Sequence, residues 1–192
     1  MLPATLRTDR LLLRCWRPED ARILKAAVDA SLAHLKASVA WARSEPTPLP
    51  ALAERLAAFA AAFHAGDEWL YAILDPSETR VLGGIGAERA EPALATVVGA
   101  AAVELGYWLR ADATGSGYAT EATAALAKAA FAHLGARRVV ICHDPINEAS
   151  GAVPRRLGFQ CLGIVPDSVL PGRRAADGSA RPATTVWTLV AE

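Results

Sequence analysis

The segment best suited to bind an anion is a glycine-containing loop between an apolar run and a helical pattern. Residues 103–109 are apolar enough for a strand, Gly115 and Gly117 follow, and a helix is expected to begin near residues 118–120. Free backbone amides at a helix N-terminus, beside glycines that lack side chains, form a cradle for phosphate groups. The pattern therefore predicts a pyrophosphate site, with an ordinary strand-to-helix turn as the alternative.

Three other motifs for phosphate binding or nucleophilic catalysis do not fit the chain. A P-loop requires a Gly-Lys pair, which the sequence lacks. Residues 84–89 contain Gly-x-Gly, but they lack the third glycine of a dinucleotide-binding fingerprint and do not open a helix. Ser116 is flanked by Thr114 and Tyr118, where a hydrolase nucleophile elbow needs two glycines.

A second candidate constellation lies near the C-terminal third of the chain. Asn147 is the only asparagine in the sequence, and Ser150 follows three residues later on the same face of a predicted helix. Asparagine is a strong helix N-cap, so a capping role is the alternative to a ligand-binding one, and both roles can coexist in one side chain.

The elements that must position these residues alternate between strands and helices in the second half of the chain. Strands are predicted at residues 11–16, 69–74, 81–87, 103–109, 139–142, 159–165 and 184–190. Helices are predicted at residues 18–30, 34–41, 52–64, 119–134 and 147–157, the last with Pro154 inside it. Residues 91–99 are assigned to no element, and residues 166–182 form a long loop. The order predicts a mixed α/β fold.

Length and composition limit the classes of protein. The 192 residues fit one domain over residues 1–192, and 53% are hydrophobic, enough for a core. A net charge of zero argues against a general nucleic-acid binder. Three widely spaced cysteines, Cys15, Cys142 and Cys161, argue against a disulfide framework and a thiolate zinc site. No signal peptide or membrane span is recognisable, so a cytoplasmic protein without a membrane or nucleic-acid partner is expected.

Four motifs in order resemble the GNAT superfamily of acetyl-CoA-dependent N-acetyltransferases, specifically its RimJ/RimL-like branch. They are TDRLLLRCWRPEDA (residues 8–21), ELGYWL (104–109), TGSGYATEA (114–122) and NEASGAVPRRLGF (147–159). The resemblance implies a central mixed, mostly antiparallel sheet of about six to seven strands with helices on both faces. It also implies that the fourth and fifth strands splay apart around the pantetheine arm. The abundance of alanine and arginine is typical of a GC-rich bacterial genome.

The resemblance assigns acetyl-CoA as the acetyl donor, with CoA as product. The pantetheine would pair with the strand backbone, the loop amides would hold the pyrophosphate, and Asn147 and Ser150 would lie near the pantetheine and thioester. Arg155 and Arg156 could reach the phosphates or form a solvated helix end. The implied donor-binding residues are Tyr107, Trp108, Leu109, Gly115, Ser116, Gly117, Tyr118, Ala119, Thr120, Asn147, Ser150 and Arg156.

The same resemblance implies direct attack by a neutral amine on the thioester. A protonated amine must first lose a proton to a base, and the leaving thiolate must gain one. Glu104 is best placed by its motif as the base, with His143, Asp144 and Asp167 as weaker candidates, and Ser150 is the acid. Two positions depart from the superfamily pattern. Thr114 stands where the loop usually starts with Gln or Arg, and Pro154 stands where many members carry a tyrosine acid.

The acceptor side is expected, by resemblance, from residues 34–50 and 166–182. Trp41, Glu45 and Asp167 are the candidate substrate-binding residues, and no metal is expected. Arg173 and Arg174 in the long loop favour an acidic partner over a polycation. The acceptor is then a protein N-terminal α-amine or a small-molecule amine. Since members of this branch are often dimers, the resemblance also implies a homodimer.

Three alternative functions remain at this stage. One is an acetyltransferase that detoxifies an amine antibiotic of the aminoglycoside kind. Another is a non-catalytic acyl-CoA-binding module, which Thr114 and Pro154 would suit. The third is an unrelated α/β nucleotide binder or hydrolase. Binding of NAD or ATP in place of CoA would identify the last.

Overall fold

One eight-stranded sheet runs through the computed structural model, which describes residues 1–191; Glu192, the last residue of the predicted domain, lies outside the described residues. The strand order is β1-β2-β3-β4-β5-β6-β8-β7, and only β5 and β6 pair in parallel. The strands are Thr5–Arg7 (β1), Leu12–Cys15 (β2), Glu68–Leu74 (β3), Val81–Arg89 (β4), Ala102–Leu109 (β5), Arg138–His143 (β6), Gln160–Pro166 (β7) and Ala183–Val190 (β8).

The predicted mixed, mostly antiparallel fold is confirmed, with one strand more than the sequence pattern indicated. The additional strand is β1, three residues that the sequence pattern does not distinguish from a loop. It pairs antiparallel with β2 at the edge of the sheet. The strands expected to be fourth and fifth are therefore β5 and β6.

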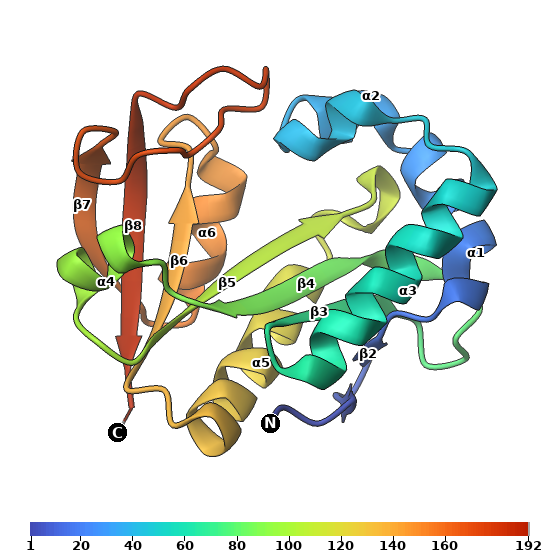
Figure 1. Cartoon of the computed structure of the whole chain (residues 1–192), viewed down its shortest axis with the longest axis horizontal. Coiled ribbons are helices and arrows are strands. Elements are labelled where there is room, and N and C mark those ends of the chain that lie inside the picture. Colours follow the sequence, from blue (N-terminus) through green and yellow to red (C-terminus); the bar gives the residue numbers. More distant parts are fainter. Residues whose placement is uncertain (192) are drawn as a thin grey trace.

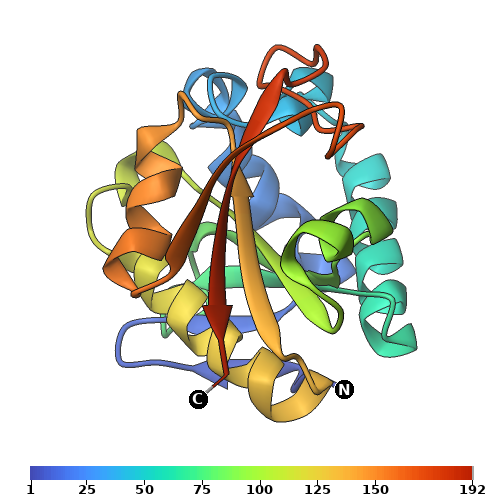
Figure 2. The same cartoon turned by 90° about the vertical axis from the view of Figure 1, so that its left-hand side faces the viewer.

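Helices cover both faces of the sheet, as Figures 1 and 2 show from two sides. One face carries Ala21–Asp29 (α1), Leu32–Lys36 (α2), Leu49–Ala65 (α3) and Pro92–Val98 (α4); the other carries Tyr118–Leu134 (α5) and Glu148–Arg156 (α6). None of the helices within residues 1–191 is long and apolar enough to cross a membrane. Helix α4 lies in residues 91–99, for which no element was predicted. Its buried Leu94 and Val98 pack with Ala102 of β5 and Val140 of β6.

The alternation of β5 decides which residues face which set of helices, because neighbouring side chains on a strand point to opposite faces. Leu105, Tyr107 and Leu109 belong to the apolar cluster that includes α5. Trp108 instead packs with the cluster formed by α1 and α3. Strand β5 thus presents one set of side chains to each face of the sheet.

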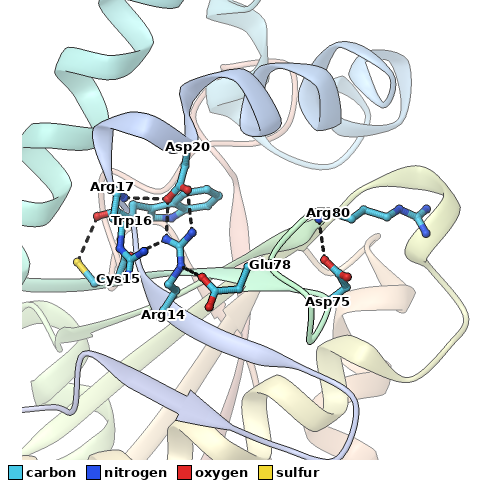
Figure 3. A network of polar contacts seen from close by, with 8 residues as sticks. All are labelled: Arg14, Cys15, Trp16, Arg17, Asp20, Asp75, Glu78 and Arg80. Atoms are coloured by element: carbon cyan, nitrogen blue, oxygen red, sulfur yellow. Dashed lines mark hydrogen bonds and ion pairs between the residues drawn. The ribbon is translucent and has the colours of Figure 1, made fainter.

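A buried arginine joins α1 to the sheet (Figure 3). Arg14 on β2 donates to both carboxylate oxygens of Asp20, at 2.7 and 2.8 Å, and to Glu78 in the turn between β3 and β4, at 2.8 Å. Asp20 also accepts from the backbone N–H of Arg17 at 2.9 Å. A buried guanidinium needs such bidentate partners to compensate for lost hydration. This network fixes the start of α1 against β2.

The predicted long loop between β7 and β8 lies over the same end of the molecule as α2, seen at the top of Figure 1. Arg43, in a 3₁₀ helix at Ala40–Ser44, donates to the backbone oxygen of Ala176 in this loop at 2.8 Å. Residues predicted to form the acceptor side, more than 120 positions apart in sequence, therefore meet.

Candidate active site

A gap opens in the sheet where β5 and β6 stop pairing. Their ladder ends at Leu105 and Ile141. Beyond it, β5 continues to Leu109 paired only with β4, while β6 continues to His143 paired with β8. The backbone of residues 106–109 therefore has one unpaired edge facing the gap. This is the splay predicted from the resemblance.

The glycine loop leads from this edge into α5. Gly115 and Gly117 have φ of +75° and +81°, a left-handed conformation that glycine adopts without strain. Gly117 is the N-cap of α5 and supplies no side-chain cap, so the first amides of the helix stay free. The hydroxyl of Thr120 is buried there without a hydrogen-bond partner among the described residues. The loop has the geometry of an anion cradle.

A cation that sequence reasoning missed lies beside this cradle. Arg10, in the turn between β1 and β2, donates to the backbone oxygen of Ser116 at 3.0 Å and lies 4.9 Å from the ring centre of Tyr118. Glu121 on α5 fixes it, accepting from Arg10 Nε at 2.7 Å. Arg10 is over 100 residues from the loop, so no local pattern links the two.

Helix α6 approaches the gap with its N-terminal turn. The Asn147 side chain accepts a hydrogen bond from the Ser150 backbone N–H at 3.1 Å, so Asn147 is the predicted N-cap. The Tyr107 hydroxyl donates to the Ser150 carbonyl oxygen at 2.8 Å, and the Ser150 hydroxyl lies 3.4 Å from the same phenol oxygen. Burial raises the pKa of Tyr107 to about 12, although its hydrogen bond with Ser150 acts in the opposite direction.

These elements enclose a cavity of about 800 Å³, called here the loop cavity. Eleven of the twelve predicted donor-binding residues line it; Tyr118 alone does not. Arg156 lines it as well, whereas Arg155 lies 5.7 Å from the ring centre of Trp187 on β8. The Thr114 hydroxyl is used internally, donating to the Ala111 carbonyl at 2.8 Å.

A second cavity, of about 540 Å³, lies between β5 and helices α1 and α3, and is called the glutamate cavity. Most of its wall is apolar and comes from Trp16, Leu24, Val28, Val39, Leu52, Phe59 and Leu70. The predicted Trp41 lines it and packs edge-on against Trp108, with ring centres 5.5 Å apart. Tyr107 and Trp108 line both cavities, so the two meet at β5.

Three carboxylates form a row across the glutamate cavity. Glu68 is directly opposite Glu88 in the β3–β4 register, and Glu88 is directly opposite Glu104 in the β4–β5 register. Desolvation raises the pKa of Glu68. Desolvation, followed by the charges of Glu104 and Glu68, raises the pKa of Glu88. Like charges placed directly opposite destabilise a sheet, so this row costs stability.

Glu104 is the buried member of the row, with 9% of its surface exposed. Arg173 of the β7–β8 loop pairs with it through both carboxylate oxygens, one of them at 2.8 Å, and also reaches Glu91 at 3.2 Å. Arg173 was expected to favour an acidic partner. In the structure, the Arg173 guanidinium instead forms ion pairs with Glu104 and Glu91 of the same chain.

The other predicted acceptor and base residues are either held by hydrogen bonds within the protein or lie outside both cavities. Glu45 lines the glutamate cavity, but its carboxylate binds Arg55 at 3.0 Å and the backbone N–H of Thr47 at 2.6 Å. Asp167 is not among the residues that line either cavity. His143 is held between the indole N–H of Trp187 at 3.0 Å and the Asp144 carbonyl at 2.7 Å, and burial lowers its pKa.

The sequence matches the family described as acetyltransferase (GNAT) domain over residues 10–160, which is most of the chain. The chain belongs to this family. This membership confirms the predicted family and, with it, the enzyme class and acetyl-CoA as the acetyl donor.

A curated relative of this GNAT chain is the protein of Bacillus subtilis (strain 168) named "Putative ribosomal N-acetyltransferase YdaF". It is 45% identical over 56 residues, which are 29% of this chain and 31% of the relative. The matched stretch is thus about a third of that protein's length.

Solved structures share the fold over nearly the whole chain. The microcin C7 self-immunity acetyltransferase MccE, in complex with acetyl-CoA and AMP, has a TM-score of 0.81 at 18% identity, covering 98% of this chain and 97% of that one. RimL, the ribosomal L7/L12 α-N-protein acetyltransferase, with CoA, has a TM-score of 0.76 at 22% identity, covering 98% and 97%. RimJ of Mycobacterium smegmatis has a TM-score of 0.75 at 20% identity, covering 94% and 82%.

Proposed function

We propose that this GNAT protein transfers the acetyl group of acetyl-CoA to a primary amine that carries positive charge, by direct attack with both substrates bound. The observation that carries the proposal is that the loop cavity and the glutamate cavity meet at β5, with Tyr107 and Trp108 lining both. Acetyl-CoA supplies an acetyl group held as a reactive thioester. Each cavity then takes one substrate, and the gap between β5 and β6 lets them meet.

The loop cavity fits an anionic, extended donor. Free amides at the start of α5 would hold the pyrophosphate, and the unpaired edge at residues 106–109 would pair with the amide groups of the pantetheine. Arg10 and Arg156 add positive charge at the cavity wall, and the unpartnered Thr120 hydroxyl is available as a donor. Because main-chain groups dominate, Thr114 in place of the usual Gln or Arg does not prevent binding.

The glutamate cavity fits a cationic acceptor. Its volume suits a small amine or the first residue of a peptide. A row of three carboxylates is unfavourable by itself, and a bound ammonium group would offset that repulsion. Trp41 and Trp108 offer aromatic faces beside it, which attract cations. Glu45 would contribute through Arg55 and Thr47 rather than by direct contact.

Two side chains would transfer protons during the reaction. Glu104, in the glutamate cavity, would accept the proton of the ammonium group so that the neutral amine can attack. Ser150, in the loop cavity, would relay a proton through its hydroxyl to the leaving sulfur, regaining one from solvent as it gives one up. The weaker base candidates His143, Asp144 and Asp167 line neither cavity, which leaves Glu104 as the proposed base.

Two kinds of acceptor agree with these features. The names of RimL and YdaF favour a ribosomal protein N-terminus. The row of carboxylates favours an amine with several charges, such as an aminoglycoside-like antibiotic, since Arg173 no longer opposes a polycation. The cytoplasmic location, the bacterial source and the homodimer remain predictions from the sequence.

The first experiment compares thermal melting with acetyl-CoA, ATP and NAD. A ligand present at about 100 times its dissociation constant stabilises the fold by about 2.7 kcal/mol. We expect a shift with acetyl-CoA alone, followed by thiol release in the presence of a panel of mono-, di- and polyamines and short peptides. A shift with acetyl-CoA but no thiol release with any amine would support the non-catalytic acyl-CoA-binding module instead.

A further inference from the structure

Helix α6 contains a proline at a position that affects Ser150. In an α-helix, the carbonyl of one residue accepts from the N–H four residues later. For Ser150 that residue is Pro154, which has no N–H, and whose ring crowds the carbonyl four residues before it. The Ser150 carbonyl therefore lacks its helical donor.

Tyr107 supplies the missing donor from another element. Its hydroxyl reaches from β5 to the Ser150 carbonyl at 2.8 Å, a normal hydrogen-bond length. Tyr107 is partly buried, and its pKa of about 12 keeps the phenol protonated at neutral pH. The bond is therefore maintained wherever an amine acetyltransferase would work.

This anchor sets the phenol beside the Ser150 side chain. The Ser150 hydroxyl lies 3.4 Å from the Tyr107 oxygen, which is long for an O–H···O bond. Because the phenol hydrogen is donated to the carbonyl, the serine hydrogen makes this contact with the phenol oxygen. A contact this long orients the hydroxyl at rest and is readily exchanged when the hydrogen turns towards another acceptor. Tyr107 lines both cavities and Ser150 lines the loop cavity, so the pair lies where the thioester sulfur is expected.

We infer that Tyr107 is a positioning residue for the Ser150 hydroxyl, anchored on the backbone carbonyl that Pro154 leaves free. The inference rests on the proposed function, because it gives Tyr107 a part in the proton transfer assigned to Ser150. It also turns Pro154, which marked a departure from the family pattern, into part of the arrangement. Pro154 leaves the Ser150 carbonyl without its helical donor, and the Tyr107 hydroxyl donates to that carbonyl instead.

The kinetic test combines Tyr107→Phe with Ser150→Ala in a double-mutant cycle, with the amine that the wild type acetylates fastest. In the wild-type background, Tyr107→Phe should lower kcat about tenfold to a hundredfold and leave the KM for acetyl-CoA nearly unchanged. In the Ser150→Ala background it should cause no further loss of kcat, because no hydroxyl remains to be positioned. An equal loss in both backgrounds, or no loss in the wild type, would overturn the inference.

The hydrogen bond from Tyr107 to the Ser150 carbonyl is tested separately from catalysis, by measuring melting temperatures. Tyr107→Phe should lower the melting temperature by about 2–4 °C in the wild-type background. It should lower it less in a Pro154→Ala background, because an alanine at this position can donate its own N–H to the Ser150 carbonyl. Equal destabilisation in both backgrounds would contradict the anchor.

Tyr71→Phe is the matched control. Tyr71 is buried, and its hydroxyl, like that of Tyr107, donates to a backbone carbonyl, that of Pro3, at 2.6 Å. Because Tyr71 lines the glutamate cavity, this variant serves as a control for stability alone: it should lose similar stability in both the wild-type and Pro154→Ala backgrounds. If the wild type melts unchanged with acetyl-CoA and releases no thiol, the proposed function fails, while the melting cycle still decides whether Tyr107 anchors on the Ser150 carbonyl.

Discussion

The two cavities are built in different ways from the same sheet. The loop cavity uses backbone amides, glycines and one strand edge, mostly from two stretches of sequence, residues 107–124 and 147–157, and Arg10 and residues 34–39 complete its wall. The glutamate cavity uses side chains from α1, α3, β3, β4 and β5, spread over more than 90 residues. A local motif can encode the first, whereas only the assembled fold defines the second. The donor is therefore readable from sequence and the acceptor is not.

The cavities also differ in charge. The loop cavity has a helix N-terminus and Arg156, which favour an anion, whereas the charge of Arg10 is paired with Glu121 in the same cavity. The glutamate cavity has Glu68, Glu88 and Glu104; Arg173 pairs with Glu104 and Arg55 with Glu45, so Glu68 and Glu88 carry the negative charge that has no ion pair among the described residues. Strand β5 lies between them, so an anionic donor and a cationic acceptor can be held on opposite sides. This separation favours two-substrate chemistry over simple storage of acyl-CoA.

The largest effect expected on the acceptor side is that of Glu104→Gln. If Glu104 removes the proton of the ammonium group, kcat should fall by about 10²–10⁴ while acetyl-CoA binding persists. Steady-state kinetics together with acetyl-CoA titration measure the two quantities separately. Glu91→Gln is the matched control, because Glu91 also pairs with Arg173 but lines neither cavity. Equal losses in the two variants would mean that Arg173 placement, not proton transfer, is what was disturbed.

The corresponding test on the donor side uses the two left-handed glycines that flank α5. Gly117→Ala forces an alanine into φ of +81°, which costs about 1–2 kcal/mol and shifts the amides of the cradle. We expect acetyl-CoA to bind about tenfold more weakly, as measured by calorimetry, corresponding to about 1.4 kcal/mol. Gly135→Ala, at φ of +63° beyond the other end of α5, carries similar strain but should leave the affinity unchanged.

Most of the fold follows from local patterns, and its exceptions have physical causes. The predicted helix 119–134 and the hairpin of β3 and β4 match the structure closely, because apolar periodicity and turn residues agree there. Strand β1 is too short for a periodic signal and exists through pairing with β2. Helix α4 has seven residues and forms because Leu94 and Val98 bury themselves against the sheet.

Residues of the candidate site with local conformational requirements could be predicted from the sequence, whereas residues defined by tertiary contacts could not. Gly115, Gly117 and Asn147 could be identified because glycine and an N-cap have local conformational requirements. Arg10 and Glu88 could not, since their significance comes from tertiary contacts and strand register. Asp167 was predicted for its charge and its place in a long loop, yet it is Arg173 of this loop that contacts Glu104.

The smallest effect, and the sharpest test of the charge difference, is that of Glu88→Gln. Glu88 is an exposed member of the carboxylate row, so one charge-assisted contact with a cationic amine is worth about 1 kcal/mol. We expect the KM for the amine to rise about fivefold at neutral pH, and more for a diamine than for a monoamine. Glu54→Gln on α3, outside both cavities, should change neither value.

The pH dependence of Glu88→Gln distinguishes this charge from a packing effect. The folded protein raises the pKa of Glu88 above the ordinary value of 4.5, so folding favours the protonated form. The carboxylate therefore lowers stability as pH rises through that raised pKa, and Glu88→Gln should increase the melting temperature at neutral pH. Below the ordinary value of 4.5 the gain should vanish, because the wild-type carboxyl is then neutral in both states. A gain that persists at low pH would mean that shape, not charge, makes the row unfavourable.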